Sequence, residues 1–112
     1  MFVYKILRTA EWAELEAAGQ SQGAPIDLQD GYVHLSSGEQ VAETAAKHFA
    51  GVDGLMLLTL EAAALGPELR WEASRGGALF PHLYRELRRT DVHNVAELPL
   101  DAASGRHRFP AL

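Results

Sequence analysis

The fold class that the sequence predicts is α+β, in a single domain over residues 1–112. Strand-like and helix-like segments alternate in the first half of the chain, and the second half is rich in strand-like segments. A content of 47% hydrophobic and 22% charged residues is ordinary for a globular protein. A chain of this length can bury enough surface to fold without disulfides, and it contains no cysteine.

The first elements have clear patterns. Residues 2–7, "FVYKIL", alternate around aromatic and β-branched side chains and predict a strand. Residues 9–19 predict a helix of about three turns, with Thr9 as its N-cap and Trp12 and Leu15 on its buried side.

A loop and a second helix follow. Residues 20–31 predict a loop because they are rich in glycine, proline and the Asp-Gly pair that favour turns. Residues 32–36, "YVHLS", predict a short strand. A helix is expected over residues 36–51, with Ser36 and Glu39 as a capping box and a second register one residue later. Its buried face is expected to hold four residues: Val41, Ala45, His48 and Phe49.

The rest of the chain predicts mainly strands. The apolar run 55–60 predicts a central strand that is covered on both faces. One helical turn is expected after it, and strands are expected at residues 69–73 and 91–100. The segment 71–84, "WEASRGGALFPHLY", reads as strand, turn and strand, and Pro81 limits its second part to an edge strand or an irregular stretch.

Charge is distributed unevenly. The net charge is −5, with three basic and ten acidic residues in 1–69, but seven arginines and five acidic residues in 70–112. Overall acidity argues against a nucleic-acid partner, because such binding needs many cationic contacts to phosphate. The arginines suit a small phosphorylated ligand, although biased codon usage explains them equally well.

Several classes of protein are disfavoured. Without cysteine there is no thiol catalysis and no thiolate metal site, and the five histidines show no metal-binding spacing, so no metal is expected. The chain has no serine-hydrolase, P-loop or dinucleotide-binding motif. It also shows no signal peptide and no apolar run long enough to span a membrane, so we expect a cytoplasmic protein.

Two places could carry chemistry, besides His82 of "LFPHLY", which points to the same side as Tyr84 and is either a core or a ligand-facing histidine. His34 ends a short strand before the expected helix, whose N-terminus at Ser36 and Ser37 would offer free backbone N–H groups to an anion. The alternative is that Ser36 only caps the helix and that His34 is a structural strand residue. The second place is Gly76-Gly77, which permits close backbone approach beside Arg75. A plain turn with a solvated arginine accounts for it as well.

The sequence also resembles a known family. The segments that carry the resemblance are "YKIL…EW", "G-x-P-x-D-x-x-D-G-Y-V-H-L-S" from Gly23 to Ser36, "EQVAETAAKHFAG", "LRWE-x-S-R-G-G-x-L-F-P-H-L-Y" and "GRHRFP". Together they look like the bacterial DUF952 family, a domain of unknown function. This resemblance implies an ADP-ribosyltransferase-like split β-sheet, with two main helices near the N-terminus and a cleft for NAD or a related ADP-ribose compound.

The resemblance implies roles for particular residues. His34 would orient a ribose hydroxyl, and Glu72 would stabilise the positive charge that develops at the anomeric carbon. The expected ligand-binding residues are Tyr32, Ser36, Ser37, Trp71, Ser74, Arg75, Phe80, His82 and Tyr84. The late-strand glutamate motif of many such transferases is missing, since Glu86 and Glu97 lie in no recognisable motif.

Three functions that involve a ligand therefore stay open, beside a purely structural or interaction role. The first is an ADP-ribosyl-transferring or hydrolysing enzyme that uses NAD as its substrate. The second is a non-catalytic module that binds a nucleotide or another small anion. The third is an enzyme that processes RNA 2′-phosphate ends, with His34 and several arginines at its site.

Overall fold

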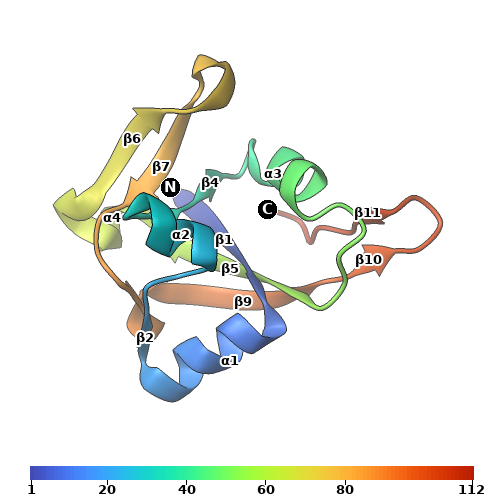
Figure 1. Cartoon of the computed structure of the whole chain (residues 1–112), viewed down its shortest axis with the longest axis horizontal. Helices are drawn as coiled ribbons and strands as arrows, with labels where there is room; N and C mark the ends of the chain where they lie inside the picture. Colours follow the sequence, from blue (N-terminus) through green and yellow to red (C-terminus); the bar gives the residue numbers. More distant parts are fainter.

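The computed structural model describes residues 1–112 apart from the side chain of Arg75, and it has a mixed α+β fold with several antiparallel sheets (Figure 1). The strands are β1 (Phe2–Arg8), β2 (Gln20–Ser21), β3 (Val33–His34), β4 (Ser36–Ser37), β5 (Leu55–Glu61), β6 (Leu69–Ala73), β7 (Leu79–Leu83), β8 (Leu87–Arg88), β9 (Val92–Leu98), β10 (Leu100–Asp101) and β11 (Arg106–His107). The α-helices of the described chain are α1 (Thr9–Ala18), α2 (Pro25–Asp30), α3 (Val41–His48) and α4 (Ala62–Leu65).

The main sheet has four antiparallel strands in the order β4-β1-β5-β9. Strand β5 lies between β1 and β9 and is covered on both faces, which confirms the central strand predicted from its apolar run. Side chains alternate between the faces, so Leu57 joins the cluster beneath α3 while Leu58 joins the cluster beneath α1.

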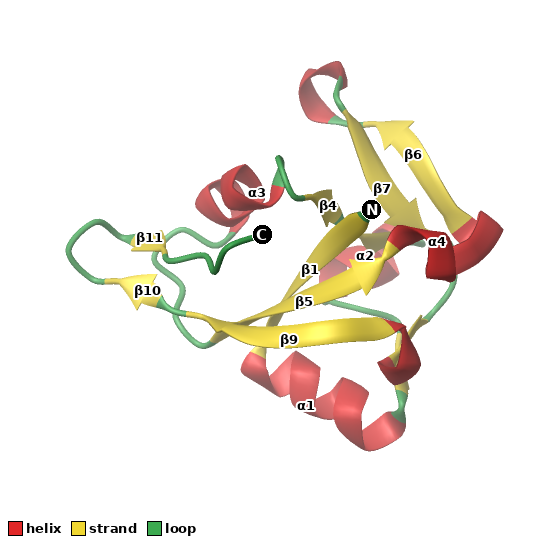
Figure 2. Ribbon diagram, turned by 180° about the vertical axis from the view of Figure 1, so that it is seen from behind, coloured by secondary structure: helices red, strands yellow, loops and turns green.

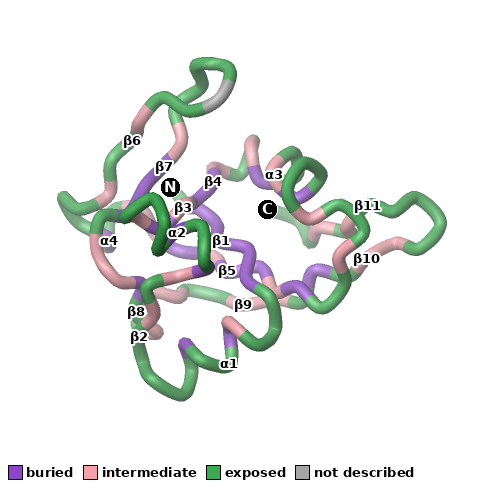
Figure 3. Tube along the Cα trace, viewed as in Figure 1, coloured by how far each residue is buried: buried purple, intermediate pink, exposed green. Residues whose placement is uncertain are grey.

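Two hydrophobic clusters stabilise the two faces, and Figure 3 shows buried segments concentrated along β1, β5 and the base of β7. The first cluster includes Trp12 and Leu15 of α1, as the helical pattern predicted. The second includes Val41 and Ala45 of α3. His48 was predicted to share this buried face, but it is exposed near the end of α3.

A smaller antiparallel sheet has the order β3-β7-β6, and its β6–β7 hairpin projects from the main sheet (Figure 2). Pro81 lies in β7, which is the middle strand of this sheet, so the prediction of an edge strand or an irregular stretch was wrong. The carbonyl oxygen of Pro81 accepts a bond from the N–H of Leu35. In a strand, the nitrogen and the carbonyl of one residue point to the same side. The nitrogen of Pro81, which lacks a hydrogen, therefore faces β3 just beyond the last residue pair between β3 and β7.

Three predicted boundaries were wrong. Residues 25–30 form helix α2 instead of a loop. Helix α3 starts at Val41, because the preceding Ser36 and Ser37 pair with β1 as strand β4. Thr9 is the first residue of α1 and not its cap; its hydroxyl donates to the Gly54 carbonyl oxygen at 2.7 Å.

The C-terminal arginine-histidine segment supplies β11 of the small β10–β11 hairpin, at the end of the molecule opposite to the β6–β7 hairpin (Figure 1). His107 Nε2 lies 2.7 Å from the carbonyl oxygen of Val52, so this ring ties the hairpin to the body of the protein. None of the helices in the described chain is long and apolar enough to cross a membrane.

Candidate functional site

Helix α2 places two carboxylates beside β3. Pro25 occupies its first turn, where a missing N–H costs nothing, and Gly31 ends it in the left-handed conformation with φ 84°. The side chain of Asp27 turns back to accept a bond from the N–H of Ala24 at 2.7 Å. This capping bond fixes Asp27 so that it faces the interior, where it is 1% exposed.

Asp27 is the centre of a buried network. Its Oδ1 accepts from the backbone N–H of His34 at 2.9 Å and from the ring Nδ1 of His34 at 2.6 Å. Its Oδ2 accepts from Lys5 Nζ at 2.8 Å, in addition to the bond from Ala24. Burial alone would raise the pKa of Asp27, but the bond from His34 and the charge and bond of Lys5 together lower the pKa below its usual value.

Gly23 is required by the same packing. A Cβ at this position would collide with the carboxylate of Asp27, and the backbone there has φ +95°. Both features exclude a larger residue without rearrangement. Gly23, the first residue of the family-like motif, therefore leaves the space that the Asp27 carboxylate occupies.

His34 meets a second carboxylate at its other ring nitrogen. Nε2 lies 2.9 Å from Oδ2 of Asp30, the last residue of α2, four positions before His34. The His34 side chain is 31% exposed and that of Asp30 35% exposed, whereas Asp27 is fully enclosed. His34 thus has one buried anionic partner and one at the surface.

The β6–β7 hairpin supplies a second histidine-carboxylate pair. His82 lies opposite His34 in the β3–β7 register, and its Nδ1 is 2.9 Å from Oε1 of Glu72. The hydroxyl of Tyr84 donates to the same oxygen at 2.6 Å. The bond from Tyr84, followed by that from His82, lowers the pKa of Glu72, so this carboxyl group is ionised at neutral pH.

Tyr32 joins the two pairs. Its ring stacks on His82 with centroids 4.2 Å apart, and it lies 4.6 Å from the ring of His34 and 5.1 Å from that of Tyr84. The guanidinium of Arg70 lies 4.8 Å over the Tyr84 ring. We call Tyr32, His34, His82 and Tyr84 the ring cluster; it presents aromatic faces next to three carboxylates, those of Asp27, Asp30 and Glu72.

Other predicted site residues lie outside this cluster. Phe80 is half-buried and shares the face of Glu72, its partner in the β6–β7 register, whereas Trp71 points to the opposite face. Ser74 is exposed, and its N–H donates to the Ala78 carbonyl oxygen in the hairpin turn. The prediction for Arg75 concerns a side chain outside the described residues.

The two predicted serines have structural partners. Ser36 is buried, and its Oγ lies 2.8 Å from Oγ1 of Thr44 on α3. The N–H of Ser37 donates to Oε1 of Gln40 at 3.0 Å. Since α3 begins only at Val41, the helix N-terminus that was expected to cradle an anion at these serines does not lie there.

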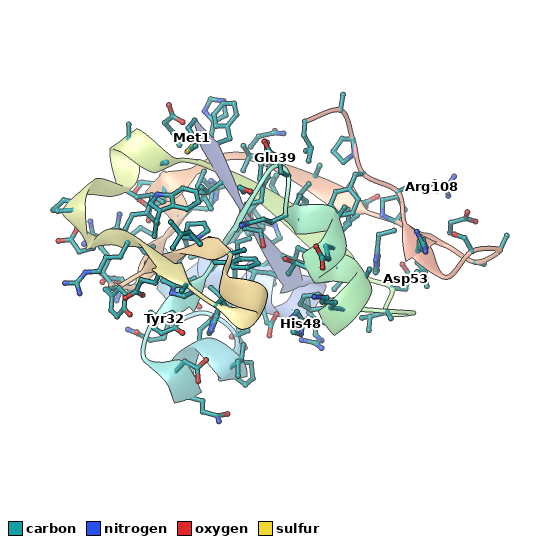
Figure 4. The ribbon with its side chains drawn as sticks, turned by 90° about the horizontal axis from the view of Figure 1, so that it is seen from above. Met1, Tyr32, Glu39, His48, Asp53 and Arg108 are labelled. Atoms are coloured by element: carbon teal, nitrogen blue, oxygen red, sulfur yellow. The ribbon has the colours of Figure 1, made fainter. Side chains whose placement is uncertain are left out.

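Two cavities lie near these residues. One of about 250 Å³ adjoins the ring cluster and is lined by Gln22, Asp27, Leu28, Gly31, Tyr32, Val33, Tyr84 and Arg85. The other, of about 430 Å³, is lined by Met1, Phe2, Tyr4, Ser37, Gly38, Glu39 and Leu112. Figure 4 shows Met1 and Glu39 well apart from Tyr32, so the two hollows are separate. Ser37 therefore borders the cavity that is remote from His34.

Three residues of this site were not singled out by sequence reasoning: Lys5, Asp27 and Asp30. Asp27 and Asp30 stand in the motif that begins at Gly23, and the signal for their helix was present. A proline at a first helical turn and a glycine just after the last turn are typical helix boundaries. Lys5 carried no such signal, because a lysine in an alternating strand is usually exposed.

Comparisons with known proteins agree with the motif resemblance. Residues 6–95 match the family model described as "Protein of unknown function (DUF952)". A crystal structure of protein CC0527 from Caulobacter crescentus has 53% sequence identity and a TM-score of 0.92, over 96% of this chain and 94% of that one. The solution NMR structure of CC0527 has 55% identity and a TM-score of 0.82, over 91% and 88%. No curated protein matches the sequence. The match over most of its length shows that the chain belongs to the DUF952 family.

Proposed function

We propose that this protein is an enzyme that acts on NAD or a related ADP-ribose compound, as a transferase or a hydrolase. One observation carries the proposal: an ionised Glu72 lies at the ring cluster that contains His34. Glu72 and His34 are 38 positions apart in the sequence, yet His82, the partner of Glu72, is paired with His34 across β3 and β7. Such convergence of a carboxylate, a histidine and aromatic faces is typical of sites that bind and cleave a ring-bearing ligand.

The roles follow from the chemistry of the bond. Cleavage breaks the bond between the ribose anomeric carbon and the nicotinamide nitrogen, and the electron pair leaves with nicotinamide. Water or another nucleophile then bonds to that carbon. Glu72 would stabilise the positive charge that the ribose develops, His34 would position a ribose hydroxyl, and Tyr32 and Tyr84 would stack on a ring.

The proposal extends to the fold. The division of the main strands into a four-stranded and a three-stranded antiparallel sheet supports an ADP-ribosyltransferase-like split sheet. The site of the proposed enzyme lies between helix α2 and the smaller sheet, where β3 and β7 pair.

A non-catalytic nucleotide-binding module is the second candidate, and a specific contact favours it. Oε1 of Glu72 already accepts bonds from both His82 and Tyr84. A carboxylate held in this way can serve to orient the rings, with no part in a reaction. Binding without product is the outcome that would select this candidate.

RNA 2′-phosphate processing has less support. Arg85 makes two bonds to Asp91, at 2.9 and 3.0 Å, and Arg70 covers Tyr84. The donors that Arg85 directs at Asp91 are already committed, whereas gripping a phosphate requires donors that face the ligand. The acidic net charge also disfavours an RNA partner.

The test is incubation of the protein with NAD and chromatographic measurement of nicotinamide release. We expect Glu72→Gln to lower the rate about a hundredfold or more, by analogy with the loss of about 10²–10³-fold when one preorganised oxyanion-hole donor is removed from a site where charge develops. Glu43→Gln is the matched control, since it removes one carboxylate on α3 that pairs only with Lys47, and it should keep the full rate. Equal rates for both variants, or no release by the unmodified protein, would eliminate the enzymatic function.

A further inference from the structure

The geometry points to His34 being a cation that binds an anionic oxygen group of a ligand, phosphate or carboxylate, at the position that Asp30 now occupies. In the ligand-free protein, Asp30 competes with the ligand for the cationic ring of His34. The inference rests on the proposed site binding a ligand, but its tests need no turnover.

The first step concerns Nδ1 of His34. Asp27 already accepts bonds from Lys5, from the Ala24 N–H and from the backbone N–H of His34, which only an ionised carboxylate does so readily. An ionised carboxylate has no proton to donate. The contact of 2.6 Å between Nδ1 and Asp27 therefore requires the proton to be on Nδ1.

The second step concerns Nε2. Asp30 lies 2.9 Å away with a third of its side chain in water, and a carboxylate there is an acceptor only. A neutral ring with its proton on Nδ1 would set the lone pair of Nε2 against this anionic oxygen, whereas a protonated Nε2 makes the close contact an ion pair. His34 is accordingly an imidazolium between two carboxylates, and it cannot accept a hydrogen bond from a ligand.

The surroundings of His34 agree with a charged ring. Helix α2 contributes Asp27 and Asp30, β1 contributes Lys5, and the hairpin contributes His82 with Glu72 behind it. Lys5 donates to Asp27 and also to the carbonyl oxygen of His34 at 3.0 Å. The two aspartates balance the two cations Lys5 and His34.

The third step concerns the two partners of the ring. Asp27 is enclosed and has four donors, so it stays in place. Asp30 is exposed and ends a six-residue helix directly before Gly31, whose φ of 84° turns the chain away. A ligand can displace only the exposed partner. Its replacement must also be an acceptor with negative charge, because the cationic ring and the charge balance demand it.

Binding of inorganic phosphate and of acetate, measured by NMR titration, tests the inference and separates the two ligand classes. Asp30→Asn removes the competing charge, so we expect about tenfold tighter binding of at least one probe, the change expected from one like charge at contact distance. Glu43→Gln removes the same charge far from the ring and should leave both affinities unchanged. His34→Gln should abolish the gain when combined with Asp30→Asn.

Two results would overturn the inference: equal or weaker binding in Asp30→Asn, or ring ¹⁵N signals of a neutral His34 in the unmodified protein at neutral pH. The binding test and the nicotinamide-release test can fail independently of each other. Tighter phosphate binding without nicotinamide release would refute the enzyme alone, whereas release with unchanged phosphate binding would refute the competitor alone.

Discussion

The two histidines of the ring cluster each bind a carboxylate, but burial is distributed in opposite ways. In the first pair the carboxylate of Asp27 is fully buried and the ring of His34 is partly exposed. In the second pair the ring of His82 is buried and the carboxylate of Glu72 is 37% exposed. The buried member of each pair is held by the fold, and the exposed member can meet a ligand.

This difference in burial separates the residues that hold the site in place from the residues that are exposed to a ligand. In the proposed site, Asp27 and His82 would orient the groups in front of them, whereas His34 and Glu72 are the groups that we propose a ligand touches. Loss of a buried member should therefore affect stability first, and loss of an exposed member should affect binding or turnover first. The following predictions test this separation, beginning with the largest effect.

Asp27→Asn should cause the greatest loss of stability. It leaves the ammonium of Lys5 buried without a negative partner, and breaking a buried pair in this way costs about 3–5 kcal/mol. The free energy of unfolding from urea titration measures it. Asp30→Asn removes an exposed carboxylate of the same helix and should cost less than about 1 kcal/mol. Similar losses of unfolding free energy in Asp27→Asn and Asp30→Asn would contradict the distinction between a buried and an exposed carboxylate.

His82→Ala should destabilise the protein by about 2 kcal/mol, because it removes a buried ring that stacks on Tyr32 and bonds Glu72. Glu72→Gln should leave the thermal midpoint close to that of the unmodified protein, since this carboxylate is at the surface. Differential scanning calorimetry compares the two. A larger loss for Glu72→Gln would reverse the roles within the second pair.

Stability should also depend on Asp27 at acid pH. The folded protein lowers the pKa of Asp27, so its contribution is fully present above the ordinary carboxyl value of about 3.9 and is lost as the pH falls through the folded pKa. Urea titrations between pH 7 and pH 2.5 measure this loss. Asp27→Asn should flatten the acid part of the curve. Asp91 accounts for part of the remaining dependence, because bonds from Arg85 lower its pKa in spite of burial.

The smallest effect is expected for Tyr84→Phe. The hydroxyl of Tyr84 is the main cause of the lowered pKa of Glu72, so its removal should raise that pKa towards the ordinary carboxyl value. A ¹³C NMR titration of the Glu72 carboxyl group follows the change. Tyr4→Phe, on the far face of the main sheet, should leave the Glu72 titration as it is. An unchanged pKa of Glu72 in Tyr84→Phe would show that the Tyr84 hydroxyl does not stabilise the ionised carboxylate.

Sequence reasoning identified His34 and Glu72, the exposed members of the two pairs, but it did not identify the contacts that orient them. His34 and Glu72 were found through family-like motifs, together with Tyr32, His82 and Tyr84. It missed α2, because glycine and proline near both ends of a six-residue helix also favour turns. It misplaced the start of α3, because a serine followed three residues later by glutamate resembles a capping box even where the serine pairs in a strand.

By itself the sequence determined the elements whose signals are local. The alternation of β1, the apolar run of β5 and the helical spacing of Trp12 and Leu15 required no knowledge of distant residues. Only the tertiary structure decided which charges meet. Asp27 is seven residues from His34 and twenty-two from Lys5, and Glu72 is ten residues from His82, so strand pairing and burial had to bring them together. Electrostatic partners depend on distance in space and on exclusion of water, and neither is encoded in spacing along the chain.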